Sequence, residues 1–124
     1  VTLDEDIVVP RASIPAMAGK ISELGKKFNV RYVVCGHAGD GNLHVHVFRG
    51  DYSEEQWKET APKVLYDLFT AAVSLGGMIS GEHGIGTTKK DYLGIGLQPE
   101  TIELMKRVKN AFDPKGILNP GKIF

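Results

Sequence analysis

Three of the chain's four histidines lie in one stretch of eleven residues, GHAGDGNLHVH, from Gly36 to His46. His44 and His46 are two residues apart, so on a strand their side chains would share a face. His37 precedes an Asp-Gly-Asn turn and His44 follows it, so a hairpin would bring these two side by side. Imidazole is the commonest side-chain ligand of transition metals. The stretch is therefore either a hairpin with incidental histidines or part of a metal site.

A third metal donor is available in the segment GEHGIG, where Glu82 stands next to the fourth histidine, His83. Glycines on both sides would let this loop approach a site closely. Two imidazoles and one carboxylate leave coordination positions open, which is typical of a substrate-binding metal rather than a structural one. The competing interpretation is that both segments are ordinary glycine-rich turns.

Other candidate motifs indicate less. Asp40 lacks the ligand spacing of an EF-hand, so calcium is not indicated. GEHGIG lacks the lysine and hydroxyl residue of a phosphate-binding loop and is not a dinucleotide fingerprint. Lys89 and Lys90 are expected on a solvated face, and Cys35 is expected to be a small core residue of its strand.

The length of 124 residues fits one domain. The 15 basic and 15 acidic residues balance, so a nucleic acid or an anionic membrane is not indicated as a partner. One cysteine excludes an internal disulfide and suits a reducing compartment. We therefore expect a cytoplasmic location, with peripheral attachment to a membrane through a partner as the alternative. The chain begins at Val1 without a methionine, which predicts a fragment of a longer protein.

The first half of the chain predicts a strand, a helix and a hairpin. The strand covers residues 1–9 and stops at Pro10. A helix follows from Ser13, its expected cap, to Asn29. Its apolar residues recur at steps of four and three, at Met17, Ile21, Leu24 and Phe28. Residues 30–36 and 42–48 then read as two strands of an antiparallel hairpin.

The second half predicts two helices and an irregular tail. Ser53 and Gln56 form a capping box that opens a long helix ending at Gly76, and Pro62 predicts a kink or break in it. Its buried stripe is expected at Trp57, Val64, Leu65, Leu68, Ala72 and Leu75. Residues 78–80 are a candidate short strand. A last helix over 99–112 has an apolar stripe, expected to join the core, at Ile102, Met105, Val108 and Phe112. This order predicts an α+β fold, a ferredoxin-like two-layer sandwich with helices on one face of an antiparallel sheet.

Three segments resemble one family: GHAGDGNLH, SGEHGIGTTKKDYL and MKRVKNAFDPKGILNPGKIF. They are similar to the C-terminal domain of FAD-linked oxidases of the vanillyl-alcohol-oxidase type. The branch is that of the glycolate oxidase FAD subunit, D-lactate dehydrogenases and D-2-hydroxyglutarate dehydrogenase. The resemblance implies that residues 1–124 form the C-terminal, cap-like substrate domain. It also implies that the N-terminal FAD-binding domain lies outside this chain.

The resemblance also implies cofactors, partners and roles. The cofactors are FAD, held mostly by the other domain, and a zinc-like divalent metal, with manganese or iron(II) as alternatives. The partners are a small 2-hydroxy acid, the N-terminal FAD-binding domain and an electron-acceptor subunit. The implied site residues are His37, His44 and Glu82 as metal ligands, His83 as catalytic base, His46 toward the substrate, and Asn119 near the flavin. The arginine that binds the substrate carboxylate in some members would precede Val1, so Arg11 is a further candidate substrate contact.

The function implied is that of a flavin-dependent 2-hydroxy-acid dehydrogenase or oxidase, in which hydride passes to FAD after metal-assisted deprotonation by His83. We expect this chain alone neither to retain FAD nor to turn over substrate. Two alternatives use the same residues differently: a non-enzymatic, ferredoxin-like module that binds a metal or ligand, and a metallohydrolase with a metal-bound water.

Overall fold

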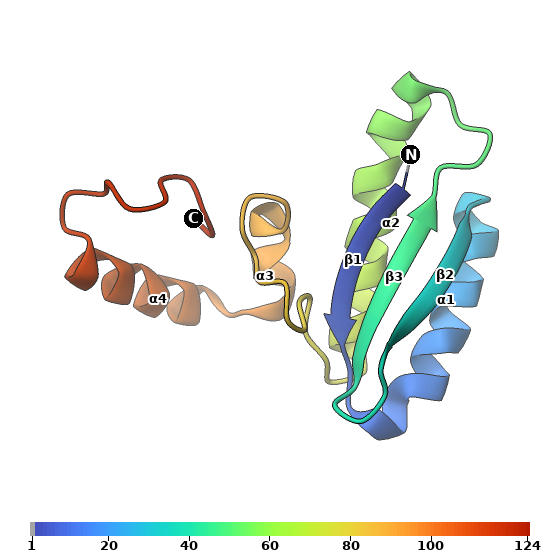
Figure 1. Ribbon diagram of the computed structural model, residues 1–124, viewed down its shortest axis with the longest axis horizontal. Coiled ribbons are helices and arrows are strands. Elements are labelled where there is room, and N and C mark those ends of the chain that lie inside the picture. The colour runs from blue at the N-terminus through green and yellow to red at the C-terminus, as the bar shows by residue number, and fades with distance from the viewer. Residues whose placement is uncertain (1) are drawn as a thin grey trace.

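The computed structural model describes residues 2–124, which form a two-layer α+β sandwich with a C-terminal extension (Figure 1). Its antiparallel sheet has the order β1-β3-β2, with strands Thr2–Val8 (β1), Arg31–His37 (β2) and Asn42–Phe48 (β3). The helices Ile14–Phe28 (α1) and Glu54–Ser74 (α2) lie against one face. Because β1 and β2 both run antiparallel to β3, they are parallel to each other, and α1 links them as a split β-α-β unit. The predicted fold class is confirmed.

The core lies between the sheet and these two helices. Alternate residues of each strand point inward, and the helices contribute the stripes that the apolar spacing predicts. The fully buried members include Ile7, Val45, Val47, Met17, Val64, Leu68, Phe69 and Ala72. Each large apolar side chain buried here contributes about 1.5–3 kcal/mol. Among residues 2–124 no helix covers the opposite face of the sheet, which leaves its side chains free to form a site.

The two ends of α1 follow different rules. A 3-10 turn, Arg11–Ser13 (η1), precedes the helix. The expected cap at Ser13 is wrong: its φ and ψ of −91° and −5° are already helical, and its side chain makes no capping hydrogen bond within the described chain. A capping side chain needs an extended backbone to reach the first amides. Asn29 ends the helix in the left-handed region, at φ 49°, as expected.

The capping box of α2 is confirmed. Ser53 Oγ accepts a hydrogen bond from the Gln56 amide at 3.2 Å, and the Gln56 side chain accepts one from the Ser53 amide at 2.9 Å. The break predicted at Pro62 does not occur, because α2 is one continuous helix. Proline removes one hydrogen bond there, while Trp57 and Val64 are buried on either side of it and hold both halves against the core.

Ser53→Ala is expected to destabilise the chain by about 1 kcal/mol, because it leaves the first-turn amides of α2 without their acceptor. Urea denaturation followed by circular dichroism measures this loss. Ser22→Ala is the matched control, since Ser22 is exposed in the middle of α1 and alanine is the better helix former there. The capping role is contradicted if both substitutions leave the midpoint unchanged.

The candidate strand at residues 78–80 is reduced to a single antiparallel bridge between Met78 and Val8. Two backbone hydrogen bonds of 3.2 and 2.9 Å join these residues. At Gly77, an added Cβ would lie 2.1 Å from the Val8 carbonyl oxygen. The two backbones therefore approach too closely for a side chain, and the segment turns away from β1 after one pair.

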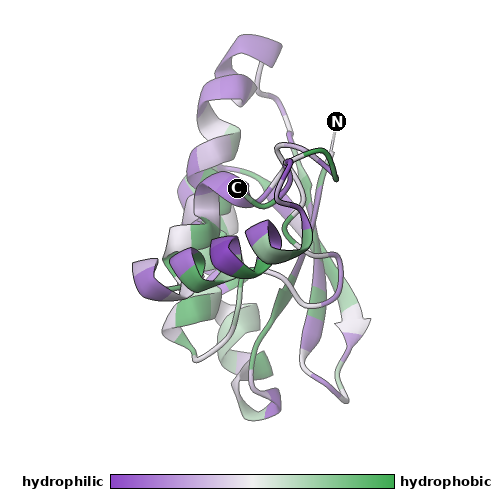
Figure 2. Cartoon of the chain, turned by 90° about the vertical axis from the view of Figure 1, so that its left-hand side faces the viewer, coloured by the Kyte–Doolittle hydropathy of each residue, from purple (hydrophilic) through white to green (hydrophobic). Residues whose placement is uncertain are grey.

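Beyond this bridge lie a 3-10 turn (η2, Lys90–Tyr92), a short helix (α3, Leu93–Gly96), the last helix (α4, Pro99–Phe112) and the tail. The bounds of α4 are as predicted, but its assignment to the core is wrong. Every residue of α4 is at least partly exposed, and Phe112 is 82% exposed. Figure 1 shows α4 and the tail to one side of the sandwich, and Figure 2, which turns that side toward the viewer, shows both hydrophilic and hydrophobic residues on the helix in front. No helix among residues 2–124 is both long and apolar enough to cross a membrane.

Candidate metal centre

The hairpin between β2 and β3 brings His37 and His44 together. The His37 carbonyl accepts hydrogen bonds from the Asp40 and Gly41 amides, at 3.2 and 3.1 Å, which closes the turn. Gly41 adopts φ 82°, a conformation that other residues rarely reach. The two imidazole rings lie 5.5 Å apart between centroids and are nearly perpendicular. The expected hairpin is therefore present, and it sets these two histidines as neighbours.

Glu82 completes a group of three donors from a distant loop. Its Oε1 lies 3.1 Å from His44 Nε2 and 3.8 Å from His37 Nε2. The three donor atoms all lie within 4.8 Å of one another. Donors around one zinc ion lie about 2.0–2.2 Å from the metal, so a small closing movement would let all three reach one ion. The donor chemistry and the spacing thus fit a divalent metal, with one side open to solvent.

His83 lies beside this group without belonging to it. Its ring centroid is 5.3 Å from that of His44, and its side chain is half exposed. Its Nδ1 faces the buried Asp6 carboxylate, with 3.6 Å between Nδ1 and Oδ1. The other ring nitrogen, Nε2, is therefore the one that can face a small molecule bound at the three donors.

Asp6 anchors the loop that carries Glu82 and His83. This side chain is fully buried. Its Oδ2 accepts hydrogen bonds from three successive amides, those of Gly81, Glu82 and His83, at 2.8, 2.5 and 3.0 Å. Its Oδ1 accepts one from the Ser80 hydroxyl at 3.2 Å. Sequence reasoning missed this residue, although the run of three acidic residues, 4–6, directly before the apolar end of β1 is a signal that could have found it.

Lys89 is the counter-ion of Asp6, which corrects its expected place on a solvated face. It is 3% exposed. Its ammonium donates to Asp6 Oδ1 at 2.5 Å, to the Asp6 carbonyl at 2.8 Å and to the Ile79 carbonyl at 3.0 Å. Glu5 Oε2 lies 3.4 Å away. One buried lysine therefore serves two buried carboxylates and ties β1 to the loop.

The two carboxylates respond differently to this environment. Burial opposes ionisation of Asp6, but the hydrogen bonds from Lys89 and from the His83 and Glu82 amides hold its pKa well below the usual range. Burial raises the pKa of Glu5, and Lys89 offsets this only in part. The environment therefore favours the ionised form of Asp6 and disfavours that of Glu5.

Close packing holds the loop against the sheet. A Cβ added at Gly81 would lie 2.3 Å from Asn42 Oδ1. The expectation that a glycine next to Glu82 permits a close approach is confirmed at this position. Asn42 Oδ1 is itself buried and has no hydrogen-bond partner within residues 2–124.

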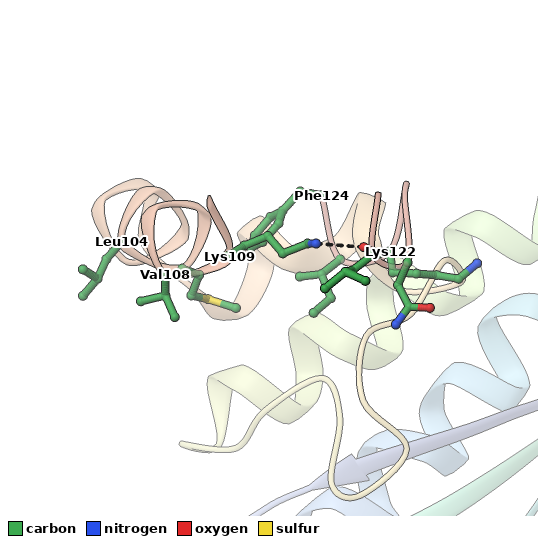
Figure 3. A pocket seen from close by; sticks show the side chains of 9 residues that line it. Leu104, Val108, Lys109, Lys122 and Phe124 are labelled. Atoms are coloured by element: carbon green, nitrogen blue, oxygen red, sulfur yellow. Dashed lines mark hydrogen bonds between the residues drawn. The ribbon is translucent and has the colours of Figure 1, made fainter. Parts of the chain in front are cut away.

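Four other residues singled out from the sequence lie outside the donor group. His46 Nδ1 is 2.7 Å from Asp4 Oδ1, and its Nε2 lies 3.7 Å from Cys35 Sγ. Cys35 is exposed on the open face of the sheet, so its expected place in the core is wrong. Arg11 lies on the exposed turn η1. Asn119 lines a groove of about 590 Å³ between α4 and the tail (Figure 3).

Comparisons with known proteins place the chain in one family. The family model for FAD linked oxidases, C-terminal domain, matches residues 1–123. The chain is 42% identical over 123 residues to the glycolate oxidase subunit GlcD of Bacillus subtilis, covering 99% of the chain and 26% of that protein. It is 44% identical over 124 residues to a D-lactate dehydrogenase of Anaerostipes hadrus, again covering 99% and 26%.

A D-2-hydroxyglutarate dehydrogenase of Stutzerimonas stutzeri is 40% identical over 122 residues, covering 96% of the chain and 26% of that protein. The chain thus spans about a quarter of the length of these curated relatives. The family match covers the first two motifs described above and all but the last residue of the third. The chain belongs to the FAD-linked oxidase C-terminal domain family.

Proposed function

We propose that this chain is the substrate-facing C-terminal domain of a flavin-dependent 2-hydroxy-acid dehydrogenase or oxidase of the glycolate or D-lactate type. The observation that carries the proposal is the convergence of His37, His44 and Glu82 beside His83. Family membership supports it. The relatives named above are called after glycolate, D-lactate and D-2-hydroxyglutarate, which share a hydroxyl next to a carboxylate.

His37, His44 and Glu82 would hold a divalent metal, with zinc favoured by the donor set and manganese or iron(II) as alternatives. A metal bound there supplies a Lewis acid that lowers the pKa of the substrate hydroxyl. With only three protein donors, such a metal would keep coordination positions open for substrate oxygens. His37 and Glu82 are more than half exposed, so a substrate reaches this side from solvent.

His83 would take the hydroxyl proton. Asp6 faces Nδ1 of the ring, so Nε2 accepts the proton on the side that the donor group occupies. A buried carboxylate behind an imidazole fixes the orientation of the ring, as the partners of metal-bound histidines do. His46 and Arg11 lie outside the donor group. Their contact with the substrate remains a prediction.

FAD, when bound, supplies the two-electron acceptor for such a reaction. The described residues alone do not form a flavin site. The GEHGIG loop leads into turns and not directly into a helix that could bind a pyrophosphate, and Asn119 lies in the groove of the tail. We therefore assign most flavin contacts to an N-terminal FAD-binding domain. An electron-acceptor subunit and a cytoplasmic location, soluble or at a membrane through that subunit, complete the proposal.

Glu82→Gln is expected to weaken zinc binding by about 100-fold or more, because the loss of a ligand should cost at least as much as the roughly 10–100-fold that the loss of an outer-shell partner costs. The substitution keeps the shape of the side chain and removes its charge. Isothermal titration of the purified chain with zinc measures the affinity. Glu103→Gln is the matched control, because Glu103 is exposed and paired with Arg107 on α4. Equal affinities of the wild type and Glu82→Gln would remove Glu82 from the site.

The reaction class is tested with the flavin-containing protein that carries this chain. Anaerobic addition of glycolate, D-lactate or D-2-hydroxyglutarate is expected to bleach the flavin absorbance with at least one of them. Zinc binding without any bound flavin, together with hydrolysis of an ester or amide substrate, would replace the proposal by a metallohydrolase. Zinc binding with neither activity would favour a non-enzymatic module.

A further inference from the structure

We infer that Asp6 and Lys89 are positioning residues of the metal centre: their buried ion pair holds the loop of residues 80–84 so that Glu82 and His83 face His44. The geometry stands by itself, and only the consequence for metal binding rests on the proposed function. Neither side chain makes a hydrogen bond or an ion pair with the side chains of the three donors. Both act through the backbone and orientation of the residues that do.

The first step of the argument is the backbone of the loop. One carboxylate oxygen of Asp6 accepts the amides of Gly81, Glu82 and His83 at 2.5–3.0 Å. Three successive amides can converge on one atom only when the chain curves around it, as in the anion-binding nests of other proteins. The curve is therefore imposed from β1, and it determines where the Glu82 and His83 side chains leave the backbone.

The second step is the closure of the segment by Lys89. Its ammonium bonds to the Ile79 carbonyl and to both the carbonyl and the side chain of Asp6. Residues 79 and 89 are thereby tied to the same point of β1. Ser80 closes the loop locally, because its hydroxyl accepts a hydrogen bond from the Gly84 amide at 2.9 Å. The two ends of the loop are therefore held against β1, while the side chains of Glu82 and His83 remain half exposed.

The third step is the register of the sheet. Asp6 pairs with His44 across β1 and β3. Residues paired in this way project to the same face of a sheet. Asp6, which anchors the loop, and the donor His44 are therefore neighbours on the open face. A loop anchored at any other residue of β1 would present Glu82 at a different height along β3. The ion pair therefore selects which histidine Glu82 meets.

The chain offers a matched control for a role limited to folding. Asp113 is also buried, accepts hydrogen bonds from the Ile117 and Leu118 amides at 3.0 and 2.9 Å, and pairs with Lys109. It anchors the C-terminal tail in the way that Asp6 anchors the loop. Asp113→Asn therefore makes the same chemical change at another buried aspartate, whose lysine partner is more exposed than Lys89, outside the donor group.

The experiment compares Asp6→Asn, Asp6→Asn with Lys89→Met, and Asp113→Asn in the purified chain. We expect zinc affinity to fall about 10–100-fold in both Asp6 variants and to stay unchanged in Asp113→Asn. Asp6→Asn leaves Lys89 paired with Glu5 alone. The double variant removes this buried charge as well, so we expect it to fold but not to regain the zinc affinity. Hydrogen exchange should show slow amides at residues 81–83 in the wild type and fast ones in both Asp6 variants.

Two results would overturn the inference. One is wild-type zinc affinity in the folded double variant, which would mean that the pair serves folding alone. The other is rapid exchange at residues 81–83 of the wild type, which would mean that Asp6 does not hold the loop. If the wild type binds no zinc, the metal-dependent proposed function fails, whereas the exchange measurement still decides whether Asp6 positions the loop.

Discussion

Replacing His83 by alanine is expected to slow substrate-dependent flavin reduction by about 10²–10⁴-fold, the usual contribution of a general base. His83 is next to the donor group but outside it, half exposed, and backed by a buried carboxylate. This arrangement suits a residue that would take a proton from a substrate hydroxyl beside the three donors. Anaerobic stopped-flow measurement of flavin bleaching in the flavin-containing protein gives the rate directly.

The zinc affinity of the same variant is the control for this experiment. His83→Ala should bind zinc as the wild type does, because the three donors remain in place. Loss of zinc together with loss of the rate would make His83 a metal ligand instead of a base. An unchanged rate of flavin reduction would eliminate the proposed base altogether.

Replacing Lys89 by alanine is expected to destabilise the chain by about 3–5 kcal/mol, the cost of breaking a buried ion pair from one side. The substitution leaves the Asp6 carboxylate without its cation and the Ile79 carbonyl without a donor. Glu5 loses its ion-pair partner as well. Native domains are stable by about 5–15 kcal/mol, so this single change removes a large part of the total. Urea denaturation gives the value.

The neighbouring lysine provides the comparison. Lys90 is exposed at the start of η2, and Lys90→Ala should change stability by about 0.5 kcal/mol or less. Similar losses of stability in the two variants would mean that the positive charge of this segment stabilises the chain and that the buried ion pair makes no separate contribution. Identical residue types at adjacent positions thus isolate the effect of burial.

Local signals in the sequence predicted many of the elements because local physics determines them. The capping box of Ser53 and Gln56, the end of α1 at Asn29 and the bounds of α4 all follow from backbone propensities within a few residues. The meeting of His37 and His44 is also local, since a short turn between two strands leaves little choice of register. The prediction of Glu82 as a third donor rests on the adjacent His83 and the flanking glycines. The number of residues between Glu82 and the hairpin does not contribute to it.

The failures share one cause, which is that a residue type does not reveal its tertiary partner. Lys89 and Lys90 are indistinguishable in sequence, yet one is buried against Asp6 and the other is exposed. Cys35 alternates correctly along β2, but its face of the sheet is the one without helices. The stripe of α4 marks an apolar face and does not specify what covers it, and the described chain covers it only in part.

The sequence by itself determined the elements, the hairpin and the two histidines that the hairpin brings together, because these depend on contacts between residues close in the chain. Only the tertiary structure decided how Glu82 and His83 reach them, more than thirty-five residues further on. That placement depends on a buried ion pair between Asp6 and Lys89, which lie 83 positions apart. Nothing in the pattern around either residue specifies the other, because the two residues meet only when the folded core brings β1 and the distant loop together.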